Sequence, residues 1–215
     1  MCEVSYRAVL FDLDGTLLYS IPKIIESFLH TLDTFLPDHA LDEAAITARL
    51  GRPLMQQMLE ISGNPDTALL MTQHYRTHNQ KLIPEMQLYG GTLDALAQIR
   101  SRVKHCGIVT SKHCDSAMMS IKQHGLSQHL DTMVFAEDTT KHKPHPAPLH
   151  LACKRLGVAP EQTVYVGDAV FDLQSAKRGG LASAAALWGP NPRATLLAES
   201  PTHPLETLTD LCAFL

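Results

Sequence analysis

Short apolar runs recur along the chain, and most of them stop at a polar residue. Residues 6–11 (YRAVLF) are rich in strand-forming types and stop at Asp12, which is the pattern of a buried strand. Four more runs share this pattern, at residues 106–110, 132–136, 163–167 and 181–187. Apolar residues at helical spacing fill the intervals, at residues 92–102, 115–124, 147–156 and 172–178. Strands that alternate with helices predict an α/β fold, with a parallel sheet between two layers of helices.

The stretch from residue 20 to residue 82 has a different pattern. Apolar residues recur there at helical spacing, as in Ile24, Phe28 and Leu32, and no strand candidate interrupts them. We therefore expect a three-layer, Rossmann-like core that carries an inserted α-helical cap. The expected limits are residues 1–17 and 84–215 for the core and residues 18–83 for the cap, with seams near 17–19 and 83–91.

Composition narrows the class of protein. Of the 215 residues, 45% are hydrophobic and 19% are charged, as in an ordinary globular protein. The net charge of −4 offers no basic surface to nucleic acid, and no stretch reaches the roughly 20 apolar residues of a membrane span. The five cysteines are scattered and form no CxxC pair, so neither a disulfide framework nor a cysteine zinc site is expected. Acidic residues stand near the beginning instead of a signal peptide, and we expect a cytoplasmic protein with no nucleic-acid or membrane partner.

Reactive residue types gather where the predicted strands end. In an open parallel sheet, ligands bind at the carboxyl ends of the strands. Four of the runs end at or lead into carboxylates, hydroxyls or amines: Asp12 and Asp14, Thr110 to Lys112, Lys141 and Lys143, and Asp168 with Asp172. Folding is therefore expected to bring several carboxylates, a lysine and a hydroxyl to one edge of the sheet.

The charges at that edge predict a magnesium site and a phosphate site. Carboxylates that converge in a partly buried site repel one another, and a hard divalent cation relieves the repulsion. Oxygen ligands without cysteine or histidine suit Mg²⁺, which also binds substrate phosphate. A phosphate would then lie between the metal and Lys143, with the Thr110 hydroxyl and loop amides as donors. One carboxylate can attack the phosphorus to form an aspartyl phosphate, and a second one two residues on can act as acid and base.

These residues resemble the haloacid-dehalogenase-like hydrolase superfamily, in its phosphatase branch. Four segments carry the resemblance, in family order over nearly the whole chain: Asp12-Leu-Asp14-Gly15-Thr16-Leu17, Thr110, Lys143-Pro-His-Pro and Gly167-Asp168-Ala-Val-Phe-Asp172. The resemblance implies Asp12 as nucleophile and Asp14 as the acid/base that also gives Mg²⁺ its backbone carbonyl. It further implies Thr110 and Lys143 as catalytic residues, and Asp168 and Asp172 as the acidic residues that complete the metal site with Asp12 and Asp14.

Further residues indicate a subgroup and its substrate contacts. The segments Thr110-Ser-Lys, Lys143-Pro-His-Pro and Ala-Leu-Trp188-Gly-Pro are most similar to the phosphoglycolate phosphatase and pyrophosphatase-like subgroup. A small phosphorylated metabolite is the expected substrate. Relatives commonly carry an acidic residue before the serine or threonine that opens the cap, where this chain has Tyr19-Ser20. The expected contacts to substrate or its phosphate are Gly15, Thr16, Ser111, Lys112 and, from the cap, Arg52, which could reach a second anionic group.

Some alternatives stay open at the level of sequence. A phosphosugar mutase would use the same aspartyl phosphate, and a non-catalytic phosphoreceiver module would use a similar set of side chains, although the cap and Asp14 argue against the module. His74 and His78 stand at i and i+4, a spacing that can bind zinc, but a solvated helix face is preferred without a third ligand. Oligomeric state is left as monomer or weak homodimer.

Overall fold

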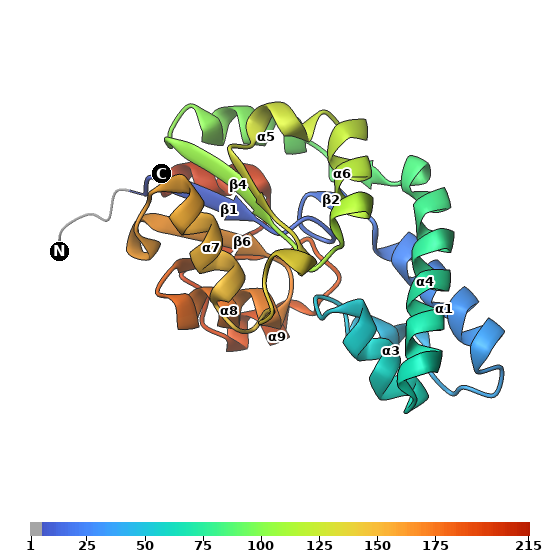
Figure 1. The fold of residues 1–215 in the computed structure, drawn as a ribbon. Helices are drawn as coiled ribbons and strands as arrows, with labels where there is room; N and C mark the ends of the chain where they lie inside the picture. The colour runs from blue at the N-terminus through green and yellow to red at the C-terminus, as the bar shows by residue number, and fades with distance from the viewer. Residues whose placement is uncertain (1–5) are drawn as a thin grey trace.

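The computed structural model describes residues 6–215 and contains a parallel sheet of six strands. The strand order is β5-β4-β1-β6-β7-β8, and every neighbouring pair is parallel. The six strands are β1 (Ala8–Phe11), β4 (His105–Val109), β5 (Thr132–Val134), β6 (Thr163–Gly167), β7 (Ala182–Ala186) and β8 (His203–Leu205). The predicted α/β fold is confirmed (Figure 1).

Two helical layers cover the two faces of this sheet, because successive side chains of a strand point to opposite sides. In β1, Val9 and Phe11 belong to the apolar core beneath α5 and α6, whereas Leu10 belongs to a second core beneath α7 and α8. All four residues of β1 are buried, as expected of a central strand. The covering helices are α5 (Thr92–Arg100), α6 (Cys114–Gln123), α7 (Ala147–Leu156), α8 (Val170–Gly179) and α9 (Arg193–Ala198).

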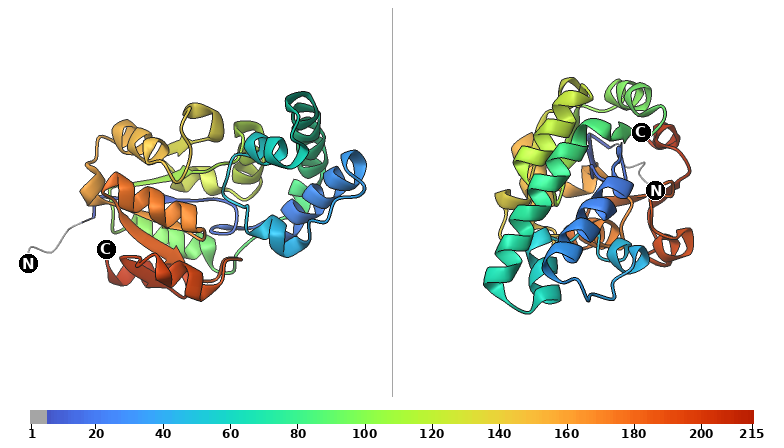
Figure 2. Two further views of the ribbon diagram at one scale, coloured as in Figure 1. Left: turned by 90° about the horizontal axis from the view of Figure 1, so that it is seen from below. Right: turned by 90° about the vertical axis from the view of Figure 1, so that its right-hand side faces the viewer.

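Four helices between β1 and the rest of the sheet form a separate body at one end of the molecule (Figures 1 and 2). They share an apolar core of their own around Phe28, Met58 and Met71. These cap helices are α1 (Ile21–Phe35), α2 (Glu43–Thr47), α3 (Leu54–Ser62) and α4 (Pro65–Leu82). The predicted helical insertion is therefore present, and the chain enters and leaves it side by side through the antiparallel strands β2 (Leu18–Tyr19) and β3 (Gln87–Leu88).

The structure adds elements that the hydrophobic pattern does not predict. The sixth strand, β8, lies at the edge of the sheet and contains Pro204, which cannot donate a backbone hydrogen bond. β2 and β3 have only two residues each, too few for any alternation. A 3-10 helix at Leu208–Ala213 packs Leu208 and Leu211 under α5, where the sequence shows no regular period.

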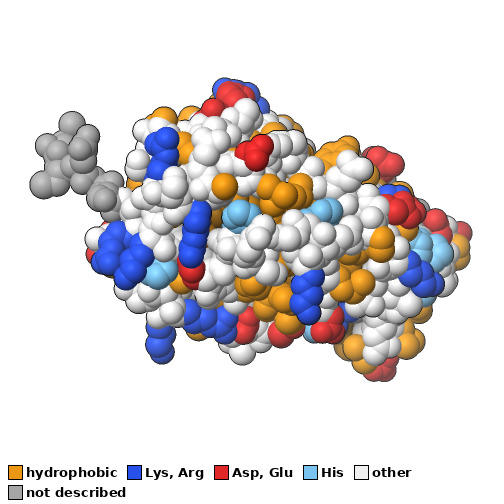
Figure 3. Space-filling view, turned by 90° about the horizontal axis from the view of Figure 1, so that it is seen from above, with side chains coloured by type: hydrophobic (Ala, Val, Ile, Leu, Met, Phe, Trp, Pro, Cys, Tyr) orange, Lys and Arg blue, Asp and Glu red, His pale blue; other side chains and the backbone are white. Residues whose placement is uncertain are grey.

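The surface mixes both signs of charge. On the face in Figure 3, acidic and basic side chains are interspersed, and histidine side chains are spread along its length. Within residues 6–215, none of the helices combines the length and apolar character needed to cross a membrane.

The order of the strands predicts where on the sheet a ligand binds. From β1 the chain builds outward through β4 and β5, then returns to the other side of β1 with β6. Such a reversal opens a crevice at the carboxyl ends of the strands. Asp12 directly follows β1 and Asp168 directly follows β6, so both lie at this crevice.

Candidate active site

Lys143 is the centre of a buried network at the crevice. Its Nζ donates to Asp12 Oδ1 at 2.9 Å, to Asp172 Oδ1 at 2.6 Å and to the Tyr165 hydroxyl at 3.0 Å. An ammonium group has three protons, so all three are used. The Tyr165 hydroxyl donates in turn to the carbonyl oxygen of Val109 at 2.8 Å. Lys143 is thereby fixed beside Asp12 by groups from β1, β4, β6 and α8.

Burial and charge set the protonation of this network. Burial raises the pKa of Asp12 to about 7, although Lys143 opposes the shift, and the neighbouring Asp172 adds to it. Burial alone would lower the pKa of Lys143, but Asp12 and Asp172 outweigh it, and the pKa lies above its usual range. The lysine therefore stays charged, while the carboxylates around it are short of positive charge.

Asp168 lies close to Asp12 and Asp172 and is held by the loop after β1. Its Oδ1 accepts a hydrogen bond from Thr16 Oγ1 at 2.7 Å. Gly15 has φ +86°, and a Cβ at this position would lie 2.5 Å from Asp168 Oδ2, so both the conformation and the space require glycine. Burial, followed by the charges of Asp172 and Asp12, raises the pKa of Asp168 well above its usual value.

Three of the predicted metal ligands converge. Oxygen atoms of Asp12, Asp168 and Asp172 all lie within 4.8 Å of one another, and the three residues are buried. The pKa values of Asp12 and Asp168 are raised because burial and the neighbouring carboxylates disfavour their ionised forms. The fully ionised cluster therefore has too little positive charge beside it. An all-oxygen donor set with this deficit fits a hard divalent cation such as Mg²⁺.

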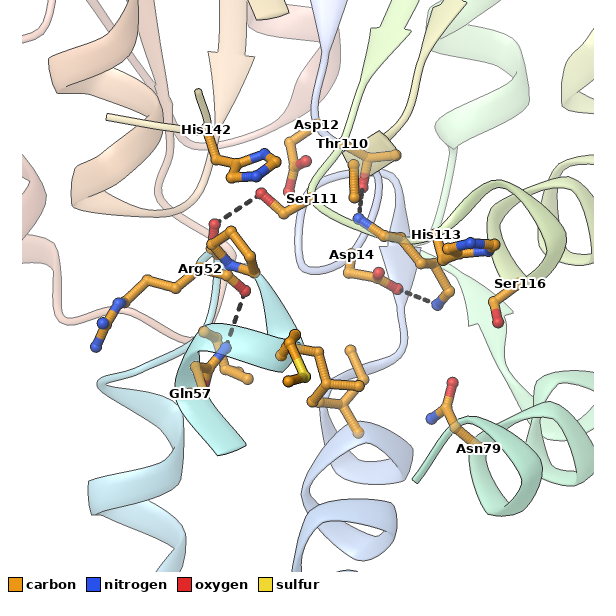
Figure 4. A pocket seen from close by; sticks show the side chains of 18 of the residues that line it. Asp12, Asp14, Arg52, Gln57, Asn79, Thr110, Ser111, His113, Ser116 and His142 are labelled. Atoms are coloured by element: carbon orange, nitrogen blue, oxygen red, sulfur yellow. Dashed lines mark hydrogen bonds and ion pairs between the residues drawn. The ribbon is translucent and has the colours of Figure 1, made fainter. Parts of the chain in front are cut away.

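The side chain of Asp14 points away from that of Asp12 (Figure 4) and is not part of the carboxylate cluster. It accepts hydrogen bonds from Ser20 Oγ at 2.6 Å and from Lys112 Nζ at 2.9 Å. Ser20 is the N-cap residue of α1, so Asp14 connects the loop after β1 to the first helix of the cap. Its carboxylate lines the pocket between core and cap, next to Asp12.

The remaining predicted contacts divide into two groups. Thr110 and Ser111 lie beside Asp12 at the end of β4, and Ser111 Oγ donates to the carbonyl oxygen of Gly51 in the cap at 2.8 Å. Arg52 contributes to the pocket wall, but its guanidinium is paired with Glu60 of α3 and points away from Asp12 in Figure 4. The structure thus brings Thr110 and Ser111 to the site and directs the Arg52 charge elsewhere.

The pocket has a volume of about 390 Å³ and lies between the core loops and the cap. Its core side carries Asp12, Asp14, Lys112 and Asp168. Apolar side chains dominate the cap side, and they include Ile21, Ile24, Phe28, Leu54 and Met55. The pocket is therefore large enough to enclose a small molecule between the carboxylates of the core and the apolar side chains of the cap.

Three residues that shape the site have no role in it that the sequence predicts. Tyr165 looks like one more apolar position of a buried strand, although a buried tyrosine hydroxyl calls for a polar partner. Trp188 Nε1 donates to the carbonyl oxygen of Thr16 at 2.9 Å and so supports the loop after β1. Next to it, a Cβ on Gly189 would lie 2.3 Å from Asp168 Cβ, a close approach that no local pattern indicates.

Comparison with known proteins agrees with this geometry. The family model described as haloacid dehalogenase-like hydrolase matches residues 9–186. The chain belongs to this family. It is 35% identical to the pyrophosphatase PpaX of Bacillus pumilus over 99% of the chain and 98% of that protein, and 34% identical to PpaX of Bacillus velezensis over 98% and 97%. The expected phosphatase-branch resemblance is confirmed, and the protein is a hydrolase.

Solved structures repeat the same architecture. A protein named provisionally as a phosphoglycolate phosphatase, from Lactobacillus plantarum, superposes with a TM-score of 0.88 at 25% identity and covers 98% of this chain and 100% of its own. The haloacid dehalogenase-like hydrolase SP0104 of Streptococcus pneumoniae superposes with a TM-score of 0.85 at 27% identity, over 97% and 98%. Core and cap thus follow the family arrangement from end to end.

Proposed function

We propose that this hydrolase is a Mg²⁺-dependent phosphatase that transfers a phosphoryl group to Asp12 and then releases it to water. Its substrate would be a small phosphorylated metabolite of the pyrophosphate or phosphoglycolate type. The observation that carries the proposal is the pairing of Asp12 with Lys143 in a buried cluster of three carboxylates at the switch point of the sheet. The pyrophosphatase relatives support the substrate class.

Mg²⁺ would be held by Asp12, Asp168 and Asp172 together with the backbone carbonyl of Asp14. When bound, it would supply the positive charge that the carboxylate cluster lacks and would attract the substrate phosphate. Thr16 and Trp188 contribute indirectly, because they fix the loop and the carboxylate of Asp168.

The chain's own residues would perform both chemical steps. A carboxylate oxygen of Asp12 attacks phosphorus in line, and the bond between phosphorus and the leaving oxygen breaks. Asp14 gives a proton to the leaving oxygen, then takes one from the water that attacks the aspartyl phosphate. Lys143 neutralises charge next to Asp12 throughout, and the Thr110 hydroxyl donates to the transferred phosphoryl group.

The cap would cover the reacting atoms. We propose residues 18–83 as the cap and residues 84–215 with the start of the chain as the core, hinged at β2 and β3. Ser20 and Gly51 contact core residues Asp14 and Ser111, so these contacts would change whenever the cap opens. A closed cap keeps bulk water from the leaving group.

Phosphate release tests the proposal. The protein would be incubated with pyrophosphate, phosphoglycolate, hexose phosphates or nucleotides, with Mg²⁺ or with a chelator. We expect release that requires Mg²⁺ and needs no activating bisphosphate; phosphate transfer between sugar positions with little release would indicate a mutase instead.

Asp12→Asn provides the decisive variant, because an amide oxygen is a poor nucleophile while its shape is the same. We expect turnover to fall by at least about 1000-fold. Circular dichroism and the melting temperature would show that the fold is retained. Turnover at the wild-type rate would remove Asp12 as nucleophile.

A further inference from the structure

We infer that Arg76, on the pocket side of α4, binds a second anionic group of the substrate and so makes the enzyme prefer substrates with such a group. The inference rests on the proposed phosphatase function and refines its substrate class. It replaces Arg52, which the sequence offers as a candidate for this role, with a residue that sequence reasoning does not single out.

Three lysine and arginine side chains line the pocket. Its lining contains Arg52, Arg76 and Lys112 as the lysine and arginine residues. Arg52 is paired with Glu60, and Lys112 with Asp14. Arg76 has neither an ion pair nor a side-chain hydrogen bond to any group within residues 6–215. Among the pocket cations that the structure describes, only Arg76 has its charge free for a ligand.

Arg76 lies on the side of α4 that lines the pocket. Tyr75, Arg76 and Asn79 are the residues of α4 that line the pocket, so Arg76 lies on the helix face that looks toward the core. Arg76 is half-buried, whereas Gln73 and Thr77, which do not line the pocket, are exposed. The guanidinium therefore belongs to the cap side of the pocket, whereas the carboxylate cluster belongs to its core side.

The chemistry of the two ends is complementary. The Asp12 end, with a metal and Lys143, would take the phosphoryl group that is transferred. A guanidinium offers a planar pair of donors that match a carboxylate or a phosphate. A substrate that carries an anion on its leaving side, such as pyrophosphate or phosphoglycolate, could contact both ends at once. A substrate with a neutral leaving group would contact only the first.

Substrate preference tests the inference. We would measure kcat/KM with Mg²⁺ for phosphoglycolate and for glycerol 2-phosphate, which has a neutral leaving group. Arg76→Gln should lower kcat/KM for phosphoglycolate by roughly 10- to 100-fold, the value of a hydrogen-bonded charge, and change that for glycerol 2-phosphate by less than about threefold. The loss should be mainly in KM, because the charge of the carboxylate does not change during the reaction.

Three further variants complete the design. Arg76→Lys should keep part of the preference. Lys81→Gln, which removes a charge from an exposed position of the same helix outside the pocket, should leave the preference unchanged. An unchanged preference in Arg76→Gln, an equal loss for both substrates, or a loss that appears in Arg52→Gln instead would overturn the assignment to Arg76.

A binding measurement separates this inference from the proposed function. Calorimetry on Asp12→Asn with Mg²⁺ needs no turnover, and Arg76→Gln in that background should weaken phosphoglycolate binding by the same factor. Unaltered binding would reject the role of Arg76. If the wild-type protein released phosphate from no substrate, the proposed phosphatase function would be rejected. The binding measurement would still test whether Arg76 contacts the anionic group.

Discussion

At the scale of single residues, the network around Lys143 combines side chains that the sequence can nominate with one that it cannot. Asp12, Lys143 and Asp172 stand in recognisable motifs, and the structure brings them within hydrogen-bonding distance. The third acceptor of Lys143 is Tyr165, inside the run Thr163–Gly167, where every residue is buried. The apolar pattern of a strand shows that its residues are buried, but it does not show that the hydroxyl of one of them contacts the site.

Removing the Tyr165 hydroxyl tests how far Lys143 depends on it. Tyr165→Phe leaves one proton of a buried ammonium group without an acceptor and removes the donor to Val109. We expect a loss of about 1–3 kcal/mol in the free energy of unfolding and reduced turnover. Chemical denaturation and phosphate release would measure both. The matched control is Tyr75→Phe, since the Tyr75 hydroxyl makes no hydrogen bond within residues 6–215; an equal cost in both variants would contradict the expectation.

From the carboxylate cluster we expect that a bound metal ion stabilises the folded protein. Mg²⁺ should raise the melting temperature of the wild-type protein, by the equivalent of about 2.7 kcal/mol at a concentration of 100 times Kd. Asp168→Asn should reduce this shift, because it removes one of three converging ligands. Differential scanning fluorimetry with and without Mg²⁺ measures the shift, and Asp115→Asn, at an exposed position, serves as control. A full shift in Asp168→Asn would place the metal elsewhere.

At the scale of elements, the loop after β1 is the part of the site that the sequence describes best. A buried strand followed by Asp-Leu-Asp-Gly-Thr predicts where the chain turns and which carboxylates face the crevice. It does not predict that Asp14 faces Ser20 and Lys112 rather than the carboxylate cluster, because both partners come from other elements. The two-residue strands that flank the cap are equally hidden, since Tyr19 pairs with Gln87 and Leu18 with Leu88, residues that lie far apart in the sequence.

A substitution in this loop tests the close approach to Asp168. Gly15→Ala meets both an unfavourable φ and an atom of Asp168 at 2.5 Å, so we expect lower stability and at least about a tenfold loss of turnover. Gly63→Ala is the matched control, because Gly63 also has a positive φ, +66°, while its added Cβ would meet nothing within 4 Å. That variant should lose about 1–2 kcal/mol and keep its activity. Equal effects of the two substitutions on turnover would mean that the contact with Asp168 is unimportant.

At the scale of the whole molecule, the order of elements along the chain predicts the architecture, whereas contacts between distant elements have to be seen in the structure. The sequence predicts the alternation of strands and helices, the helical insertion and the edge of the sheet where reactive groups gather. It does not predict that His30 of α1 stacks on His78 and His74 of α4, with ring centroids 4.0 and 5.0 Å apart. A third imidazole thus does lie next to His74 and His78, but it comes from another helix and stacks on their rings. Within residues 6–215, the only cluster of side chains that could hold a metal ion is formed by Asp12, Asp168 and Asp172.

The C-terminal edge strand predicts a pH effect on stability. His203 of β8 lies between Tyr6 and Phe214, and burial lowers its pKa. Below about pH 6.5 the unfolded chain takes up a proton that the folded chain does not, so this histidine makes stability fall as the pH falls. His203→Gln cannot titrate, and its loss of melting temperature between pH 7.5 and 5.5 should be smaller than that of the wild type. Parallel losses would show that His203 contributes nothing to the pH dependence.

Trp188 is the single tryptophan of the chain, and its indole donates to the loop that carries Asp14, Gly15 and Thr16. Its ring also meets Tyr89, just after the returning strand of the cap, and Tyr89 meets Tyr19 on the outgoing strand. Tryptophan fluorescence of this protein therefore comes from one place, between the loop after β1 and the two strands that connect the cap to the core. The protein carries a native fluorophore there, and its emission should follow each opening and closing of the cap without any added label.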